Sequence, residues 1–86
     1  MQRAFVLMNV ELGKEEEISK ELKKIEEVKE VYVVYGTYDL IAEVEATTTG
    51  KLHETIAYKV RRLKDIRSTN TLIVTEGKEE TWYWRL

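Results

Sequence analysis

A glycine and an aspartate stand where two strand-like segments reverse direction, in the stretch Val34-Tyr35-Gly36-Thr37-Tyr38-Asp39-Leu40. Gly36 permits positive φ and close approach of a partner or ligand to the backbone. The chain has 14 Glu but only two Asp, so Asp39 does not simply reflect general acidity. Its carboxylate can accept hydrogen bonds from a ligand amine, which makes this hairpin the best candidate for a small-molecule site. The alternative is that Asp39 only hydrogen-bonds its own turn, since short Gly/Asp turns are common.

Other residue types give weaker indications of chemistry. His53 is the only histidine, and it has no Ser, Cys or Asp beside it in a catalytic pattern. The chain has no Cys, so thiol catalysis is excluded and a structural zinc site is not expected. Glu43 and Glu45 point the same way from one predicted strand. They either bind a cation or exchange protons, or they form the solvated face of an edge strand. We expect no metal, no cofactor and no enzymatic activity.

Charge and composition restrict the partners. Five basic residues lie close together in the sequence: Lys59, Arg61, Arg62, Lys64 and Arg67. The net charge is −2, however, and basic residues near a helix C-terminus complement the helix dipole, so direct nucleic-acid binding is not expected. No apolar run is long enough for a signal sequence or a membrane span, and the lack of Cys fits a cytoplasmic protein. The dominance of Glu and Lys among the charged residues is typical of thermophile proteins.

Hydrophobic periodicity predicts six elements. Alternation of apolar and polar residues predicts strands at residues 3–12, 30–35, 40–46 and 66–75. Apolar stripes at helical spacing predict helices at residues 14–28 and 51–64, separated from residues 40–46 by a loop at residues 47–50. This β-α-β-β-α-β order predicts an α+β, ferredoxin-like sandwich, with four antiparallel strands and both helices on one face. We expect one domain over residues 1–77 and an aromatic tail over residues 78–86.

The pattern also predicts self-association. Both helices cover one face of the sheet, yet the first two predicted strands are apolar on both faces, as with Phe5 and Leu7 against Val6 and Val10. Soluble monomers rarely expose large apolar patches, so we expect at least a dimer with facing sheets. The aromatic tail, Trp82-Tyr83-Trp84, packs either on its own core or on a neighbouring subunit, or stacks on a base or sugar.

The chain resembles the effector-binding (RAM, regulation of amino acid metabolism) domain of the Lrp/AsnC transcriptional regulators. Residues 31–40 are similar to the family's strand–Gly-x-Tyr-Asp–strand segment. Residues 66–71, Ile66-Arg67-Ser68-Thr69-Asn70-Thr71, are similar to the threonine-x-threonine entry to its last strand. The resemblance covers essentially the whole chain.

The resemblance implies a fold of the dimeric α/β-barrel type and a regulatory role. Dimers would assemble further, up to octamers, and bind a small amino-acid effector between dimers. The backbone around Gly36 to Tyr38 would hold the ligand carboxylate, and Asp39 would face the amino group or fix the loop. The implied ligand-binding set is Gly36, Thr37, Tyr38, Asp39, Leu40, Thr69 and Thr71. The first predicted strand begins at about residue 3, so we expect no helix-turn-helix and a stand-alone module that acts alone or joins a full-length Lrp/AsnC regulator.

Two other functions fit the residues. One is a small dimeric α/β-barrel enzyme that uses His53 or Asp39 in a pocket between the sheets. The other is a structural assembly adaptor that binds no ligand. A cleft at residues 36–39 would favour the sensor, whereas an enclosed pocket with His53 pointing into it would favour the enzyme.

Overall fold

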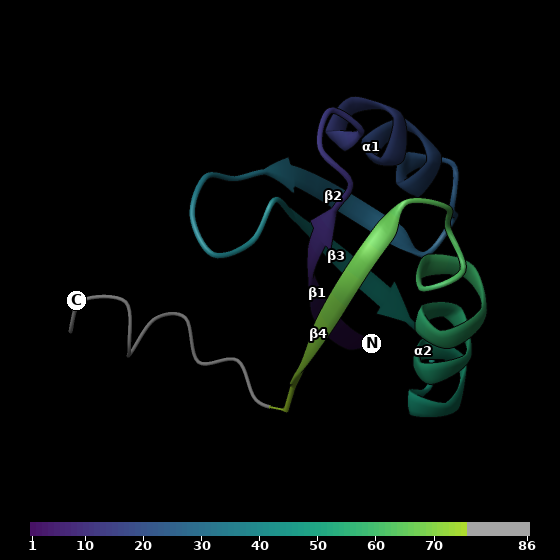
Figure 1. Ribbon diagram of the computed structural model, residues 1–86. Coiled ribbons are helices and arrows are strands. Elements are labelled where there is room, and N and C mark those ends of the chain that lie inside the picture. Colours follow the sequence, from purple (N-terminus) through teal and green to yellow (C-terminus); the bar gives the residue numbers. More distant parts are fainter. Residues whose placement is uncertain (76–86) are drawn as a thin grey trace, which may run out of the picture.

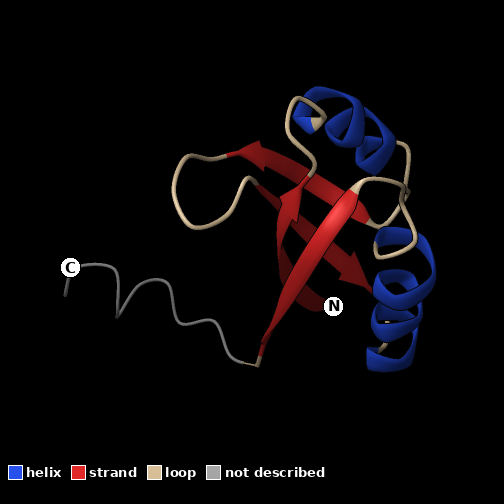
Figure 2. Cartoon of the chain, viewed as in Figure 1, coloured by secondary structure: helices blue, strands red, loops and turns tan. Residues whose placement is uncertain are grey.

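The computed structural model describes residues 1–75, which form an antiparallel sheet in the order β2-β3-β1-β4 with two helices on one face (Figure 1). Figure 2 shows both helices on the same side of the sheet, which leaves the other face without a helix. The elements are β1 (Gln2–Val10), α1 (Glu15–Lys23), β2 (Val28–Val33), β3 (Leu40–Ala46), α2 (Thr49–Thr55), a π-helical segment η1 (Ile56–Val60) and β4 (Ile66–Val74). The predicted ferredoxin-like α+β sandwich is confirmed.

The core lies between the sheet and the helices. Alternate residues of the two central strands are buried there, as the alternation predicted: Ala4, Val6, Met8, Val10, Leu40, Ala42, Val44 and Ala46. The helical layer closes the core with Ile18, Leu22, Leu52, Ile56 and Val60. The odd-numbered residues of β1, among them Phe5 and Leu7, are only half-buried because they lie on the open face of the sheet.

The first helix is shorter than the sequence predicted. It ends at Lys23 instead of continuing to residue 28, and Val28 is the first residue of β2, where it pairs with Val44. The apolar stripe predicted across residues 18–28 is therefore shared between a helix and the strand that follows it. The strand β2 therefore begins and ends before the predicted bounds of residues 30–35, and its last residue is Val33.

The second helix also differs from the prediction. It begins at Thr49, because the Thr48 hydroxyl accepts a hydrogen bond from the Lys51 amide at 3.1 Å and caps the first turn. Thr49 and Gly50 are thus helical, not part of a loop. From Ile56 to Val60 the helix widens to π geometry, and the Arg61 amide donates to the Ile56 carbonyl at 2.9 Å. Leu63, predicted as the end of the apolar stripe, lies beyond both helical segments and is partly buried.

The sheet order corrects one further prediction. Glu43 and Glu45 were assigned to the solvated face of an edge strand, but β3 lies between β2 and β1 and is a central strand. Both residues do lie on the open face, where each is half-buried. The edges of the described sheet are β2 and β4.

The predicted domain end at residue 77 and the aromatic tail lie outside the described residues. Within residues 1–75, no helix is long and apolar enough to cross a membrane.

Candidate ligand-binding site

The hairpin predicted as the site is a loop of residues 34–39 between β2 and β3. The Val34 amide donates to the Asp39 carbonyl at 3.0 Å and closes the loop at its base. Gly36 adopts φ of 149°, a conformation that favours glycine, and a Cβ placed on it would meet nothing within 4 Å. Its requirement for glycine is therefore conformational and does not come from close packing inside the described chain.

Asp39 joins this loop to the end of β1. Its amide donates to the Met8 carbonyl at 2.9 Å, and its carboxylate oxygen Oδ2 accepts from the Val10 amide at 3.0 Å. The ladder between β1 and β4 shifts register between Asn9 and Val10, so the carboxylate caps an amide at an irregular point of the strand. Its side-chain hydrogen bond thus reaches a distant strand, not the turn that the alternative interpretation proposed.

The other predicted ligand-binding residues of the hairpin differ in their exposure to solvent. The Tyr38 hydroxyl accepts a hydrogen bond from the Asn70 side chain at 3.1 Å, which ties the loop to β4. Gly36 and Thr37 are exposed. The Leu40 side chain is fully buried in the core, so only its main chain is available to a ligand.

A hollow of about 390 Å³ opens beside Asp39, between the ends of β1 and β4. Its lining is mainly polar: Asn9, Val10, Asp39, Arg67 and Ser68. Arg67 reaches Glu11 through Nε at 3.6 Å, and the Asn9 amide donates to the Ser68 hydroxyl at 3.3 Å. The sequence did not single out Asn9 or Ser68. Arg67 and Ser68 fall within residues 66–71, which carry the family resemblance. The resemblance could therefore have pointed to these two residues.

The two threonines of the predicted set lie on the other face of the sheet. Thr69 pairs with Met8 and Thr71 with Val6, and cross-strand partners share a face, so both threonines face the helical layer. Thr71 lines a second hollow, of about 340 Å³, together with His53 on α2. The structure therefore brings Asp39 together with Arg67, not with Thr69 and Thr71.

His53 and the glutamate pair do not form a catalytic arrangement. His53 is exposed on α2, on the helical side of the sheet, and so it cannot point into a pocket between two facing sheets. Glu43 lies near Arg3, with 3.5 Å between Oε2 and Nη1, so a cation already balances its charge. No group of three metal-ligating side chains occurs in the described chain.

Three of the five basic residues have partners within the described chain. Lys59 contacts Glu27, Arg62 stacks over the Tyr58 ring with 5.5 Å to its centroid, and Arg67 contacts Glu11. These contacts favour the structural interpretation of the cluster over a nucleic-acid surface.

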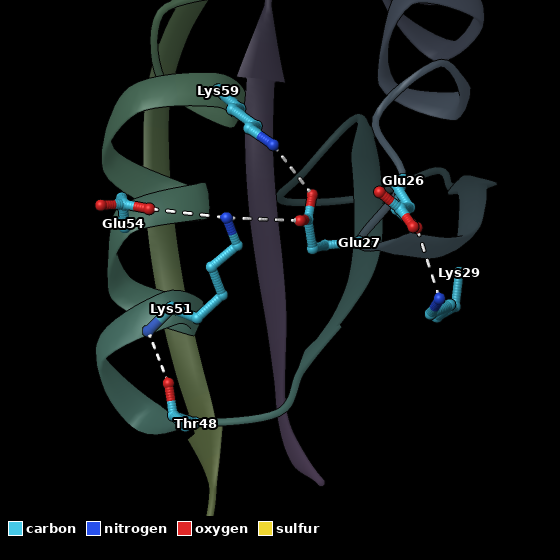
Figure 3. Close-up of polar contacts among 7 residues, drawn as sticks. All are labelled: Glu26, Glu27, Lys29, Thr48, Lys51, Glu54 and Lys59. Carbon is cyan, nitrogen blue, oxygen red and sulfur yellow. Dashed lines mark hydrogen bonds and ion pairs between the residues drawn. The ribbon is translucent and has the colours of Figure 1, made fainter.

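Glu27 is the polar centre that the sequence reasoning missed (Figure 3). It precedes β2, and its carboxylate lies 3.2 Å from Lys59 Nζ and 3.9 Å from Lys51 Nζ, both on the α2–η1 layer. Burial raises the pKa of this carboxyl, but a hydrogen bond from its own backbone, the hydrogen bond from Lys59 and the charges of both lysines outweigh it, so the pKa is lowered. The cluster therefore links the start of β2 to the second helix.

Fold and geometry together define the class: an α+β domain with a polar hollow where an aspartate hairpin meets two strands. A family model described as the Lrp/AsnC ligand binding domain matches residues 3–83, and the chain belongs to this family. The resemblance predicted from residues 31–40 and 66–71 is confirmed.

Known relatives agree with this assignment. The transcriptional regulator FL11 of Pyrococcus abyssi is 31% identical over 78 residues, which are 91% of this chain and 51% of that protein. The chain thus spans about half the length of that regulator. The crystal structure of FFRP-DM1 is 46% identical with a TM-score of 0.82, covering 86% of this chain and 99% of that one. The hypothetical protein PHS023 of Pyrococcus horikoshii is 41% identical with a TM-score of 0.83, covering 96% and 99%. Similarity to proteins of Pyrococcus accords with the thermophile-like composition.

Proposed function

We propose that this chain is an effector-binding and assembly module that modulates transcription, and that it binds a small amino acid in the hollow beside Asp39. The carrying observation is that one hollow is lined by both Asp39, which has a carboxylate, and Arg67, which has a guanidinium. A free amino acid is a zwitterion, with an ammonium group that suits Asp39 and a carboxylate that suits Arg67. Asn9 and Ser68 add neutral hydrogen-bonding groups to the same hollow.

The hairpin provides further donors. Within residues 1–75, the amides of residues 35–38 donate to no other backbone group, whereas those of Val34 and Asp39 do. Gly36 holds the loop at a positive φ, and residues 35–37 are exposed. The amides around Gly36 to Tyr38 are the donors that the resemblance assigns to the ligand carboxylate, and their lack of a backbone acceptor within the described chain supports that role. Thr69 and Thr71 face the helical layer and would contact a ligand only from a second site.

Amino acids as ligands are also suggested by a protein of the same fold. The feast or famine regulatory protein of M. tuberculosis, 23% identical with a TM-score of 0.70, has been solved in complex with L-methionine. That ligand belongs to that protein. For this chain, the mainly polar lining of the hollow and its paired opposite charges are the grounds for proposing an amino acid.

The module would act by assembly and not by chemistry. We propose that two copies pack through their open sheet faces and that dimers associate further, up to octamers, with the effector bound where dimers meet. Such an assembly could include a full-length regulator of the family in the cytoplasm. His53, the strongest candidate for a catalytic base, lies on the helical side of the sheet, which favours the sensor over the α/β-barrel enzyme. A structural adaptor would form the same assembly but would bind no effector.

Native mass spectrometry of the purified chain with each of the twenty amino acids tests the proposal. We expect dimers or multiples of dimers that retain one amino acid per subunit, or that change size with one. An assembly that binds none of the twenty amino acids and keeps its size would contradict the sensor function and favour the adaptor.

Matched variants locate the site. Asp39→Asn keeps an oxygen for the Val10 amide but removes the charge, and Arg67→Gln removes the guanidinium together with an exposed, weak ion pair. Each should weaken binding of the identified amino acid about 10- to 100-fold, as expected for a lost charge-assisted hydrogen bond. Arg62→Gln, a change of the same kind on the helical side, should leave the affinity unchanged. Unaltered affinity in both site variants would place the ligand elsewhere.

A further inference from the structure

The second hollow, of about 340 Å³, lies on the helical side of the sheet, between the α2–η1 layer and β4. Its volume is within the range of small-molecule sites, which is roughly 300–1,000 Å³. Half of its lining is apolar, and half can donate hydrogen bonds. The apolar residues are Ile56, Ala57 and Ile73, and the donors are His53, Arg61 and Thr71.

The strand β4 supplies one wall of this hollow. Thr71 pairs with Val6 and Ile73 with Ala4, and both partners are fully buried in the core. Cross-strand partners share a face, so Thr71 and Ile73 lie on the helix-facing side of the sheet. Ile73 is nevertheless 37% exposed, which is unusual for an isoleucine on that side. This wall therefore offers a hydroxyl next to an apolar side chain that is only partly covered.

The π-helical segment η1 explains how three residues of the opposite wall come together. His53, Ala57 and Arg61 follow one another at intervals of four, and in a regular α-helix residues eight apart are about 80° out of line. The Arg61 amide instead donates to the carbonyl of Ile56, five residues back, at 2.9 Å. This wider turn takes up more residues, so it brings Arg61 back towards the line of His53 and Ala57. Short π segments inside helices frequently occur at functional sites.

The side chains of this wall favour a negatively charged ligand group. Within residues 1–75, Arg61 takes part in no ion pair, whereas Lys59 and Arg67 each contact a glutamate. None of the described residues that line the hollow is acidic. A guanidinium pairs well with a carboxylate, and a histidine ring N–H and a threonine hydroxyl can donate to the same group. No carboxylate in this lining would balance the ammonium of an amino acid.

We propose that this hollow is a second ligand site, for a small carboxylate that has a branched apolar body and no ammonium group. Arg61, with His53 and Thr71, binds the carboxylate, and the apolar body packs on the three apolar lining residues. The Asp39 hollow differs because its lining includes both an acidic and a basic residue. The inference concerns a different face of the sheet and does not depend on the amino-acid proposal.

Ligand-detected saturation-transfer NMR of the full chain tests the proposal with 4-methylpentanoate, which is leucine without its ammonium group. We expect saturable binding that Arg61→Gln weakens about 10- to 100-fold, as for a lost charge-assisted hydrogen bond. Arg62→Gln is the matched control at the adjacent position outside the lining, and it should leave the affinity unchanged. Ala57→Leu fills the hollow without changing any charge and should weaken binding several-fold. Circular dichroism verifies that the variants fold.

Three further compounds define the ligand class. 4-Methylpentanamide lacks the charge, inorganic phosphate lacks the apolar body, and leucine adds the ammonium group. Each should displace 4-methylpentanoate only at concentrations at least about tenfold higher than unlabelled 4-methylpentanoate itself requires. Displacement by leucine at equal concentration would show that the hollow accepts amino acids and would overturn the proposed class.

Two other results would overturn the site itself. One is the absence of saturable binding of 4-methylpentanoate to the wild type. The other is an equal loss of affinity in Arg61→Gln and Arg62→Gln, which would mean that general positive charge, and not this hollow, attracts the carboxylate. Failure of every amino acid to bind the chain would contradict the proposed sensor function but would leave this second site standing.

Discussion

At the scale of single residues, Asp39 combines two properties that are usually alternatives. Its carboxylate caps the Val10 amide, and it also lines the hollow proposed to bind the effector. A carboxylate has two oxygens and about four acceptor sites, so one hydrogen bond to β1 leaves room for a ligand ammonium. The structural role identified here therefore supports the binding role by fixing the orientation of the group.

This double role predicts different results for two substitutions of Asp39. Asp39→Ala removes the acceptor of a partly buried amide and should lower the free energy of unfolding by about 1–3 kcal/mol. Asp39→Asn keeps an acceptor oxygen and should stay within about 0.5 kcal/mol of the wild type. Urea unfolding of the three proteins measures the difference. Equal destabilisation by both substitutions would show that the charge, not the hydrogen bond, holds the loop.

Glu27 predicts a pH dependence of stability. Its pKa in the folded chain is lowered below the ordinary value of 4.5 because Lys59 and Lys51 outweigh the effect of burial. The unfolded chain thus takes up the proton first as the pH falls. The stability that Glu27 contributes is complete above the ordinary pKa and is lost as the pH falls through the lower, folded pKa.

Comparison of the wild type with Glu27→Gln isolates this contribution. We expect a difference in unfolding free energy of about 1 kcal/mol at neutral pH, which shrinks as the pH is lowered from about 5 to 3. Urea unfolding at a series of pH values measures it. Glu26→Gln, at the exposed neighbouring position, should show no such trend. A difference that grows in acid would contradict the lowered pKa.

At the scale of elements, the central strand β3 was easier to predict from this sequence than the end of α1. The alternation of Leu40, Ala42, Val44 and Ala46 gives β3 with the observed bounds, because a strand buried on one face has period two. The end of α1 could not be predicted in the same way. Val28 fits the helical apolar stripe, yet it belongs to β2, since its position opposite Val44 in the core is decided by sheet pairing, which local spacing does not encode.

The candidate site was only half predictable for a related reason. The hairpin of residues 36–39 is local, so its glycine and aspartate stand out in the sequence. Asn9 and Arg67 join Asp39 only because β1 ends between β3 and β4, a non-local arrangement. Thr69 and Thr71 were predicted to add ligand contacts from the last strand, and the register of β4 places both on the helix-facing side of the sheet.

The start of α2 gives a prediction at this scale. Thr48 caps the helix by accepting from the Lys51 amide, and Thr48→Ala should lower the free energy of unfolding by about 1 kcal/mol. Thr47→Ala, one residue earlier and exposed, is the matched control and should have little effect. Thermal unfolding measures both. Equal effects of the two substitutions would mean that Thr48 does not act as the cap.

At the scale of the whole molecule, the open face of the sheet is the surface proposed to pack on a second copy. Phe5, Leu7 and Ile41 lie on it half-buried, and Tyr32 at 48% exposure lies next to Ile41. Arg3 and Glu43 form an ion pair on the same face. A twofold arrangement of two such faces would bury the apolar centre and leave the charged pair at its margin, which is the composition expected of an interface core and rim.

Leu7→Glu tests this assembly, because it places a charge at the centre of the proposed interface, opposite Ile41. Burial of an unpaired carboxylate should cost about 3 kcal/mol or more and raise the dimer dissociation constant at least ~100-fold. Tyr58→Glu, which adds the same charge on the helical side, should leave the dimer intact. Light scattering across a concentration series measures the change, and circular dichroism verifies that Leu7→Glu still folds. A folded Leu7→Glu variant that dimerises as tightly as the wild type would show that the copies associate through another surface.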